Sequence, residues 1–429
     1  MTQNTPDLPF NISDHHVWRP YTQMKTTPAA LKVKSAQGVH IELEDGRRLI
    51  DGVSSWWTVC HGYRHPHIMQ AVKAQMDRVP HVMLGGLTHA PAQTLAQRLA
   101  ALAPGDLNHV FFCESGSVSV EIAMKIAMQS WINRGERGHT KFVCFKGGYH
   151  GDTLATMSVC DPEEGMHSLF AGGLQQQLVT ALPRDESARE AFESLISKRR
   201  AEIAGIITEP LVQGAGGMKF HTPATLAYLR DVCDRFGLPL ILDEIMTGFG
   251  RLGTMFACEK AGVVPDIMTV SKALTGGTLP LAAAIASSRL FADFWSDDAG
   301  AALMHGPTYM GNPAACAAAN ASIDLFEQEP RLEQVAAIEA VFAKRLPEAR
   351  DFPGIVDVRW QGAIGVLEFP ALPELEALKA RFVDAGVWVR PFGNIIYLMP
   401  PYVITADELD TLITATLNVT RGWAEEYFL

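Results

Sequence analysis

The 429-residue sequence lacks a long apolar run. No stretch approaches the ~20 consecutive apolar residues that cross a bilayer as a helix. The N-terminal residues also lack the basic and apolar regions of a signal peptide. A formal net charge of -11 disfavours nucleic acid and anionic membranes as main partners. These features predict a cytoplasmic protein that acts on small molecules.

Disulfide and metal-ligand patterns are also missing. The seven cysteines are scattered singly, odd in number and without CxxC spacing, which indicates reduced thiols in the core. The fourteen histidines form no HExxH pattern, so we expect no metal. What the sequence does have is length and a hydrophobic content of 48%, enough for two or three domains with a large core.

Two short apolar runs between residues 238 and 277 each end near a charged residue. Residues 238–242 precede Asp243, and residues 267–270 precede Ser271 and Lys272. Uninterrupted runs of this length suit strands that are covered on both faces, as in a parallel sheet. Ligands of open α/β sheets gather at the carboxyl ends of the strands. We therefore expect Asp243 and Lys272 to point into one crevice.

A lysine and an acid in one crevice suggest pyridoxal phosphate. A buried lysine is the usual carrier of Schiff-base chemistry, because its pKa moves readily when it is desolvated. A buried acid needs a cationic partner. The aldehyde of pyridoxal phosphate can condense with the lysine amine, and its protonated ring nitrogen can pair with the acid. A structural ion pair between Asp243 and Lys272 explains the two residues alone equally well.

Two further segments have the features of a cofactor site. Residues 109–113 read as a strand, residues 114–117 as a turn with two serines, and residues 118–131 as a helix. This order builds a phosphate site at a helix N-terminus, although serine can also act there as a simple N-cap. Glycines surround Tyr149, whose ring could stack on a planar ligand. The alternative is a glycine-rich loop with a packed tyrosine.

The order of elements predicts an α/β fold. Strands alternate with helices from about residue 110 to residue 268, which indicates a mostly parallel sheet with helices on both faces. Residues 31–54 alternate as in a hairpin, and residues 351–423 read as a small α+β domain with two helices. We expect an N-terminal arm and hairpin over residues 1–60, a large domain over 61–329, and a small domain over 330–429.

The motifs resemble those of the class III aminotransferases, which have the fold-type I architecture and use pyridoxal phosphate. The resemblance covers nearly the whole chain. The motifs that carry it are Ser115-Gly116-Ser117, Gly148-Tyr149-His150-Gly151, Asp243-Glu244-Ile245, Thr247-Gly248-Phe249-Gly250-Arg251 and the lysine segment that ends in Thr275-Gly276-Gly277. Met246, Leu252 and Ser271 depart from the usual residues of that family.

Other segments are similar to the biotin-synthesis branch of this family. They include Trp18-Arg19-Pro20-Tyr21, Ser54-Ser55-Trp56-Trp57, residues 213–218, residues 305–313 and Arg390-Pro391-Phe392-Gly393. This resemblance implies amino transfer from S-adenosylmethionine to 8-amino-7-oxononanoate. The alternatives are lysine as donor, another class III enzyme acting on ω-amino acids or diamines, an aminomutase, or a non-catalytic protein that keeps the fold.

The resemblance also implies roles for single residues around the cofactor. Lys272 would carry the cofactor and move the substrate proton, Asp243 would pair with the ring nitrogen, and Tyr149 and Ile245 would cover the two ring faces. Gly116 and Ser117 would bind the phosphate together with Pro307 and Thr308 of a neighbouring subunit, which implies a homodimer. Tyr21, Trp56 and Gly306 would shape the substrate pocket together with Tyr149 and Lys272. Arg390 would bind the substrate carboxylate. Glu209 and Asp152 are expected to support these groups.

Overall fold

A seven-stranded sheet forms the centre of the large body in the computed structural model, which describes residues 16–162 and 166–429. The first fifteen residues, part of the predicted arm, lie outside the described part. The strands follow in the order β4 (His109–Cys113), β12 (Ala282–Ala286), β11 (Ile267–Val270), β10 (Leu240–Asp243), β7 (Ile203–Thr208), β5 (Lys141–Phe145) and β6 (Leu178–Thr180). All neighbours pair in parallel except β12, which is antiparallel to β11 and β4. The predicted mostly parallel sheet is confirmed.

Helices cover this sheet because its central strands are apolar on both faces. Every residue of β10 and β11 is buried. Helix α4 packs across β7, β11 and β12, and the Trp131 indole N–H donates a 2.9 Å hydrogen bond to the carbonyl of Ala204 in β7. The helices are α1 (Ser54–Trp57), α2 (Pro66–Arg78), α3 (Ala90–Leu102), α4 (Gly116–Asn133), α5 (Leu154–Ser158), α6 (Glu186–Arg199), α7 (Pro223–Phe236), α8 (Ser288–Ala292), α9 (Pro313–Gln328), α10 (Arg331–Arg345), α11 (Leu375–Asp384) and α12 (Ala406–Phe428).

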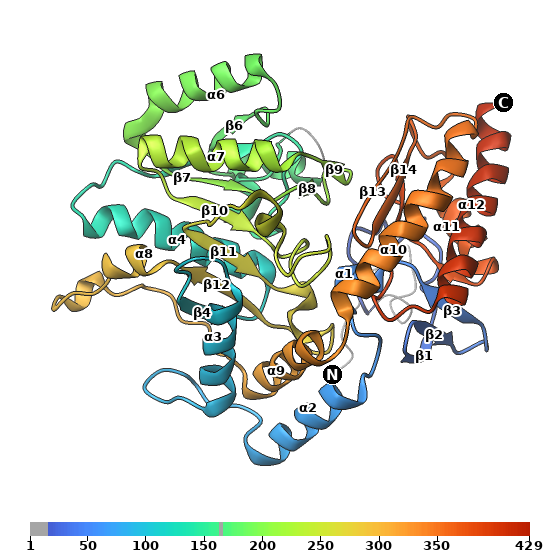
Figure 1. Cartoon of the computed structure of the whole chain (residues 1–429), viewed down its shortest axis with the longest axis horizontal. Coiled ribbons are helices and arrows are strands. Elements are labelled where there is room, and N and C mark those ends of the chain that lie inside the picture. Colours follow the sequence, from blue (N-terminus) through green and yellow to red (C-terminus); the bar gives the residue numbers. More distant parts are fainter. Residues whose placement is uncertain (1–15, 163–165) are drawn as a thin grey trace, which may run out of the picture.

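Two smaller sheets accompany the C-terminal helices (Figure 1). One is antiparallel, with the order β13 (Asp357–Gln361), β14 (Ile364–Glu368) and β16 (Ile395–Leu398). The other joins the predicted N-terminal hairpin, β1 (Val33–Gln37), β2 (His40–Leu43) and β3 (Arg48–Asp51), to β15 (Val387–Trp388). The hairpin and the C-terminal segment thus share one sheet. The domain limits near residues 60 and 330 stay a prediction.

Local signals placed some elements correctly and misplaced others. Helix α7 spans the predicted residues, because Thr222 caps its start, Pro223 follows and Gly237 ends it with φ 60°. The strand expected at residues 355–358 begins later, since its register with β14 pairs Asp357 with Glu368. Helix α10 was not predicted. A short two-stranded ladder, β8 (Val212–Gln213) with β9 (Lys219–Phe220), closes the glycine-rich loop between them.

The tryptophan pair lies in a left-handed helical turn and not at the end of a strand. Ser54, Ser55, Trp56 and Trp57 have φ of 49°, 47°, 60° and 75°. Such a turn costs roughly 1–2 kcal/mol per residue for residues with a side chain. It directs Trp57 inward, where it is 7% exposed, and leaves Trp56 46% exposed. One indole therefore faces the interior, and the other is partly exposed.

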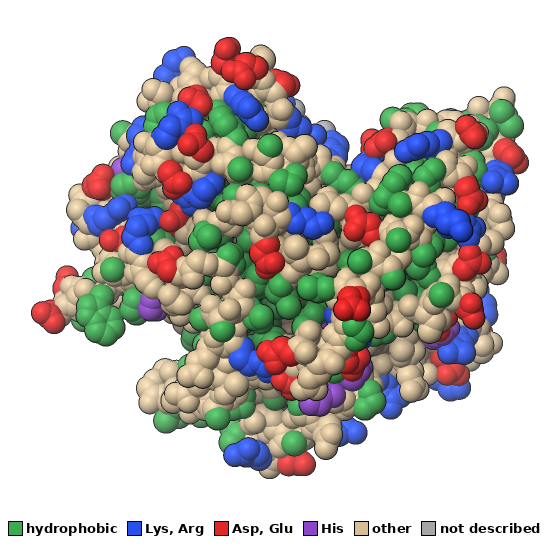
Figure 2. Space-filling view, in the orientation of Figure 1, with side chains coloured by type: hydrophobic (Ala, Val, Ile, Leu, Met, Phe, Trp, Pro, Cys, Tyr) green, Lys and Arg blue, Asp and Glu red, His purple; other side chains and the backbone are tan. Residues whose placement is uncertain are grey.

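The visible surface carries acidic and basic side chains interspersed with apolar ones (Figure 2). Among the described residues, no helix is both long and apolar enough to cross a membrane.

Candidate active site

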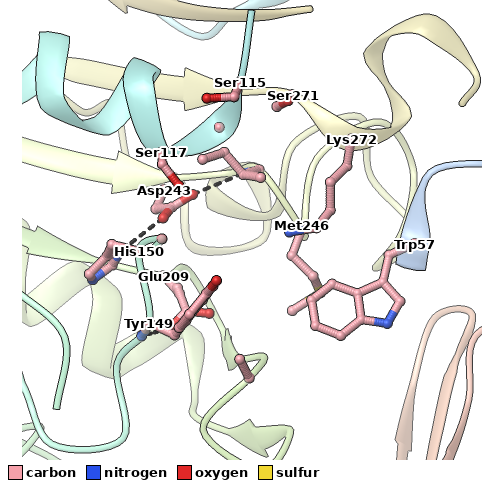
Figure 3. A pocket seen from close by; sticks show the side chains of 14 residues that line it. Trp57, Ser115, Ser117, Tyr149, His150, Glu209, Asp243, Met246, Ser271 and Lys272 are labelled. Carbon is pink, nitrogen blue, oxygen red and sulfur yellow. Dashed lines mark hydrogen bonds and ion pairs between the residues drawn. The ribbon is translucent and has the colours of Figure 1, made fainter. Parts of the chain in front are cut away.

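One cavity lies at the carboxyl ends of five strands. Figure 3 shows the side chains that line it. Strands β4, β5, β7, β10 and β11 run in the same direction, so their ends meet at one edge of the sheet. The cavity between them has a volume of ≈ 190 Å³. Its lining residues are Trp57, Ser115, Gly116, Ser117, Tyr149, His150, Gly151, Glu209, Ala215, Asp243, Ile245, Met246, Ser271 and Lys272. Six residues predicted to hold the cofactor therefore lie together.

Asp243 ends β10 and is almost fully buried. Its Oδ2 lies 2.8 Å from Nδ1 of His150, and its Oδ1 accepts the N–H of Ile245 at 3.1 Å. In the part of the chain that the structure describes, the close side-chain partner of Asp243 is His150, and no ion pair joins Asp243 to Lys272. The simple ion-pair interpretation is therefore wrong. Sequence analysis assigned no role to His150, although this residue lies in the glycine-flanked motif after β5.

Lys272 begins the 3-10 turn that follows β11, with an unusual φ of 28°. A side-chain-bearing residue in this region stores backbone strain, which is common at functional sites. The Lys272 Nζ lies 4.8 Å from the centroid of the Trp57 ring. Burial lowers the pKa of the amine, although Asp243 and Glu209 act to raise it. A lower pKa increases the fraction of neutral amine, which is the nucleophilic form.

The N-terminus of α4 can hold an anion. The Ser115 Oγ accepts the N–H of Val118 at 3.3 Å, so serine caps the helix as the alternative interpretation expected. The N–H groups of Gly116 and Ser117 belong to the first turn, where no preceding turn supplies acceptors. A Cβ on Gly116 would lie 3.1 Å from the Ile245 Cδ1, so this glycine lets Ile245 pack against the turn. Capping and anion binding are compatible here.

Gly151 brings the loop of residues 149–152, called the tyrosine loop, against the first turn of α4. Its φ is +132°, and a Cβ there would lie 2.2 Å from the Ser117 Oγ. The N–H of Asp152 donates to that oxygen at 3.3 Å. Only glycine permits this approach, because any side chain would meet Ser117 and strain the backbone.

Glu209 connects the tyrosine loop with the glycine-rich loop at Gly214. Its carboxylate accepts the N–H of Tyr149 at 3.0 Å and the N–H of Gly214 at 2.8 Å. Burial raises the pKa of Glu209 to about 7, with a further increase from Asp243 and a decrease from His150. The predicted supporting role of Glu209 thus has a structural basis in two backbone hydrogen bonds.

The predicted substrate residues Tyr21, Trp56 and Arg390 line a second cavity of ≈ 510 Å³. The rings of Tyr21 and Trp56 meet edge to face with centroids 6.1 Å apart. The Arg390 guanidinium lies over Trp388, 5.5 Å from its centroid. The Tyr21 hydroxyl donates to the Asp152 carboxylate and so connects this cavity with the tyrosine loop. Burial and Asp152 raise the pKa of Tyr21 to about 12.

Gly306, Pro307 and Thr308 line neither of these cavities of the described chain. Gly306 and Thr308 are exposed. The segment before them is tied to α4, because the Lys125 amine donates to the carbonyl of Met304 and lies 3.2 Å from the His305 Nδ1. The roles predicted for Gly306, Pro307 and Thr308 stay predictions.

Glu244, the neighbour of Asp243, points away from the cavity into the core. Its carboxylate accepts the hydroxyl of Thr247 and, at 2.9 Å, the N–H of Cys258. It is completely buried, and burial raises its pKa from 4.5 to about 7.

The raised pKa of Glu244 predicts that the free energy of unfolding falls as the pH rises from 4.5 to about 7. In this window the folded state binds more protons than the unfolded state, so its stabilising contribution is lost as the pH increases. Urea unfolding should show that wild type loses stability relative to Glu244→Gln between about pH 5 and about pH 8. Glu42→Gln should show no such trend there, because hydrogen bonding to Lys34 lowers the pKa of Glu42. Parallel pH profiles for wild type and Glu244→Gln would contradict the prediction.

The residues of the first cavity fit pyridoxal phosphate. A lysine with a lowered pKa suits an aldehyde, and a buried carboxylate suits a protonated ring nitrogen. The N-terminal turn of α4 suits a phosphate, and Gly116 and Gly151 let Ile245 and the loop of Tyr149 pack closely against this turn. The arrangement can therefore hold the cofactor at both its charged ends.

Comparisons with known proteins agree with this geometry. A family model described as aminotransferase class-III matches residues 21–419. The adenosylmethionine-8-amino-7-oxononanoate aminotransferase of Mycobacterium leprae is 42% identical in an alignment of 424 positions that covers 97% of this chain and 97% of that protein. The crystal structure of the enzyme of that name from Methanocaldococcus jannaschii covers 96% of this chain and 98% of its own, with a TM-score of 0.91 and 32% identity. A PLP-bound amine transaminase from an uncultivated Pseudomonas species gives a TM-score of 0.88 at 32% identity, covering 95% of this chain and 98% of its own.

Proposed function

The chain belongs to the aminotransferase class-III family, and we propose that it transfers the amino group of S-adenosylmethionine to 8-amino-7-oxononanoate with pyridoxal phosphate as cofactor. The product is 7,8-diaminononanoate, an intermediate of biotin synthesis. The observation that carries the proposal is the cavity in which Lys272 and the Asp243–His150 pair meet the N-terminus of α4. Relatives named for this reaction cover nearly the whole chain, which supports the choice of substrates.

Five residues of the first cavity have roles in this proposal that their positions support. When bound, pyridoxal phosphate supplies the carbonyl that takes up the amino group and the electron sink that stabilises the substrate carbanion. Lys272 attaches the cofactor and moves the proton at the substrate Cα. Asp243, held by His150, keeps the ring nitrogen protonated. Tyr149 and Ile245 cover the ring faces.

The phosphate site needs groups from two chains in this proposal. Gly116 and Ser117 bind the phosphate from α4, and Pro307 and Thr308 reach it from a neighbouring subunit. Gly306 of one subunit contributes to the substrate pocket of the other. The exposure of Gly306 and Thr308 within one chain supports a homodimer. All seven cysteines, which lie in the described part, are buried and unpaired, which supports a cytoplasmic location.

The second cavity suits both substrates. Arg390 binds the carboxylate that S-adenosylmethionine and 8-amino-7-oxononanoate share. Tyr21 and Trp56 offer apolar faces for the aliphatic chain of the acceptor. The same faces attract the sulfonium of the donor by cation–π interaction. One pocket can thus receive a cation and an alkyl chain in turn.

A single half-reaction tests the proposal. S-adenosylmethionine alone should bleach the visible absorbance of the purified holoenzyme, because the amino group passes to the cofactor. Adding 8-amino-7-oxononanoate should restore the colour. Lysine, β-alanine, ornithine and putrescine serve as alternative donors. If lysine bleaches the absorbance and S-adenosylmethionine does not, the donor is lysine. If only an ω-amine bleaches it, the biotin-pathway assignment is refuted.

A further inference from the structure

We propose that Asp51 is a positioning residue that holds the left-handed turn of residues 54–57, and through it the tryptophan walls of both cavities, Trp57 in the first and Trp56 in the second. The inference rests on the proposed function, because it concerns the pocket assigned there. Asp51 lies outside both cavities, at the end of β3. It therefore acts through the residues that follow it.

The Asp51 carboxylate serves this turn directly. It is completely buried. Its Oδ1 accepts the N–H of Val53 at 2.9 Å, and its Oδ2 accepts the N–H of Ser55 at 2.8 Å and the hydroxyl of Tyr63 at 2.6 Å. The first N–H groups of any helical turn lack partners within the turn. Asp51 supplies these partners, so the carboxylate caps a left-handed turn as an N-cap residue caps an α-helix.

The turn needs such support because its backbone conformation is unfavourable. Four consecutive residues with side chains have positive φ. The N–H of Trp57 bonds to the carbonyl of Val53 at 2.9 Å, and the N–H groups of Thr58 and Val59 bond to that of Ser54 at 2.8 and 3.0 Å. Three hydrogen bonds worth about 1 kcal/mol each do not offset four strained residues. Contacts from outside the turn must supply the remainder, and the Asp51 carboxylate makes two of them.

Both tryptophans depend on this turn for their placement. The Trp57 indole N–H donates to the Tyr397 hydroxyl at 3.1 Å, and its ring lies 4.8 Å from the Lys272 amine. Trp56 meets Tyr21 on the other side, in the second cavity. If the turn relaxed to a right-handed or extended conformation, both rings would leave these positions. Asp51 thus fixes the walls of two cavities with one carboxylate.

The test is the substitution Asp51→Asn. An amide offers one acceptor oxygen where the carboxylate offers two, so the Val53 or Ser55 N–H would face an NH₂ group. The probe is nonanoate, which has the carboxylate and alkyl chain of the acceptor but no reactive carbonyl. Calorimetry on the holoenzyme should show its dissociation constant raised by between about tenfold and a hundredfold. The KM for 8-amino-7-oxononanoate should rise similarly.

A glycine rescue separates positioning from a merely structural role. Ser55 is exposed, with φ 47° and ψ 60°, a conformation that glycine adopts without strain. In a protein that already carries Ser55→Gly, adding Asp51→Asn should raise the dissociation constant of nonanoate by about threefold or less. Tyr63→Phe is the matched control, because it removes one donor to Asp51 but leaves both backbone contacts. It should change nonanoate binding by less than about threefold.

The outcomes distinguish this inference from the proposed function. If Asp51→Asn binds nonanoate as wild type does, the positioning role is refuted. Loss of binding that glycine does not rescue would also refute it. If Asp51→Asn does not fold, the double variant of Asp51→Asn and Ser55→Gly replaces it in the test. This double variant should fold and bind nonanoate. If wild type itself does not bind nonanoate, the proposed pocket fails and the inference fails with it.

Discussion

Replacing Lys272 by alanine should lower turnover by about 10⁴-fold or more, while the protein still binds pyridoxal phosphate without a covalent bond. The substitution removes both the group that attaches the cofactor and the group that moves the Cα proton. Proton transfer by a positioned side chain alone contributes about 10²–10⁴-fold. The Asp243–His150 pair and the α4 N-terminus remain, so the charged ends of the cofactor keep their partners.

Absorbance and equilibrium dialysis would measure cofactor binding in Lys272→Ala, and single-turnover kinetics would measure the remaining rate. Lys198→Ala is the control, because Lys198 is an exposed lysine of α6. It should retain wild-type turnover and the wild-type spectrum. Turnover of Lys272→Ala within tenfold of wild type would refute the assigned role.

Replacing Asp243 by asparagine should lower turnover by about 10³-fold. Asparagine keeps the shape of the side chain but loses the charge that keeps the ring nitrogen protonated. Without that proton the ring withdraws electrons less strongly as charge develops at the substrate Cα. Removal of one electrostatic contact to a developing charge costs about 10²–10³-fold in comparable enzymes. The amide should also hold the His150 ring less strongly than the carboxylate does, which should weaken cofactor binding.

Glu244→Gln is the matched control for Asp243→Asn. It neutralises the adjacent acid, whose side chain bonds to Thr247 and Cys258 in the core instead of lining the cavity. Its turnover should stay within about twofold of wild type at neutral pH. Equal losses in both variants would indicate that charge in this strand end supports folding only, which would contradict the role of Asp243.

Much of the fold could be predicted from the sequence, because apolar runs and turn residues act locally. The runs before Asp243 and Lys272 form neighbouring parallel strands, and helix α7 begins and ends at its capping residues. The direction of β12 could not be read from its pattern, because a run of buried alanine and isoleucine suits either orientation.

The candidate site was predicted less completely, because some of its contacts join distant segments. His150 and Asp243 are 93 residues apart, and their pairing depends on how β5 and β10 are placed in the sheet. The left-handed turn at Trp56 contradicts the local preference of serine and tryptophan. It forms because Asp51 is buried beside it. Local propensity contains no information on such a partner.

The pairing of β3 with β15 bears on how the chain folds during synthesis. The strands of the seven-stranded sheet lie between residues 109 and 286, and the ribosome completes them well before β15 at residues 387–388. The edge of β3 therefore stays unpaired while about three quarters of the chain is synthesised. An unpaired strand edge can associate with other chains. Nascent chains stalled before residue 387 should be the species that chaperones bind most, through a hairpin whose last partner has not yet been translated.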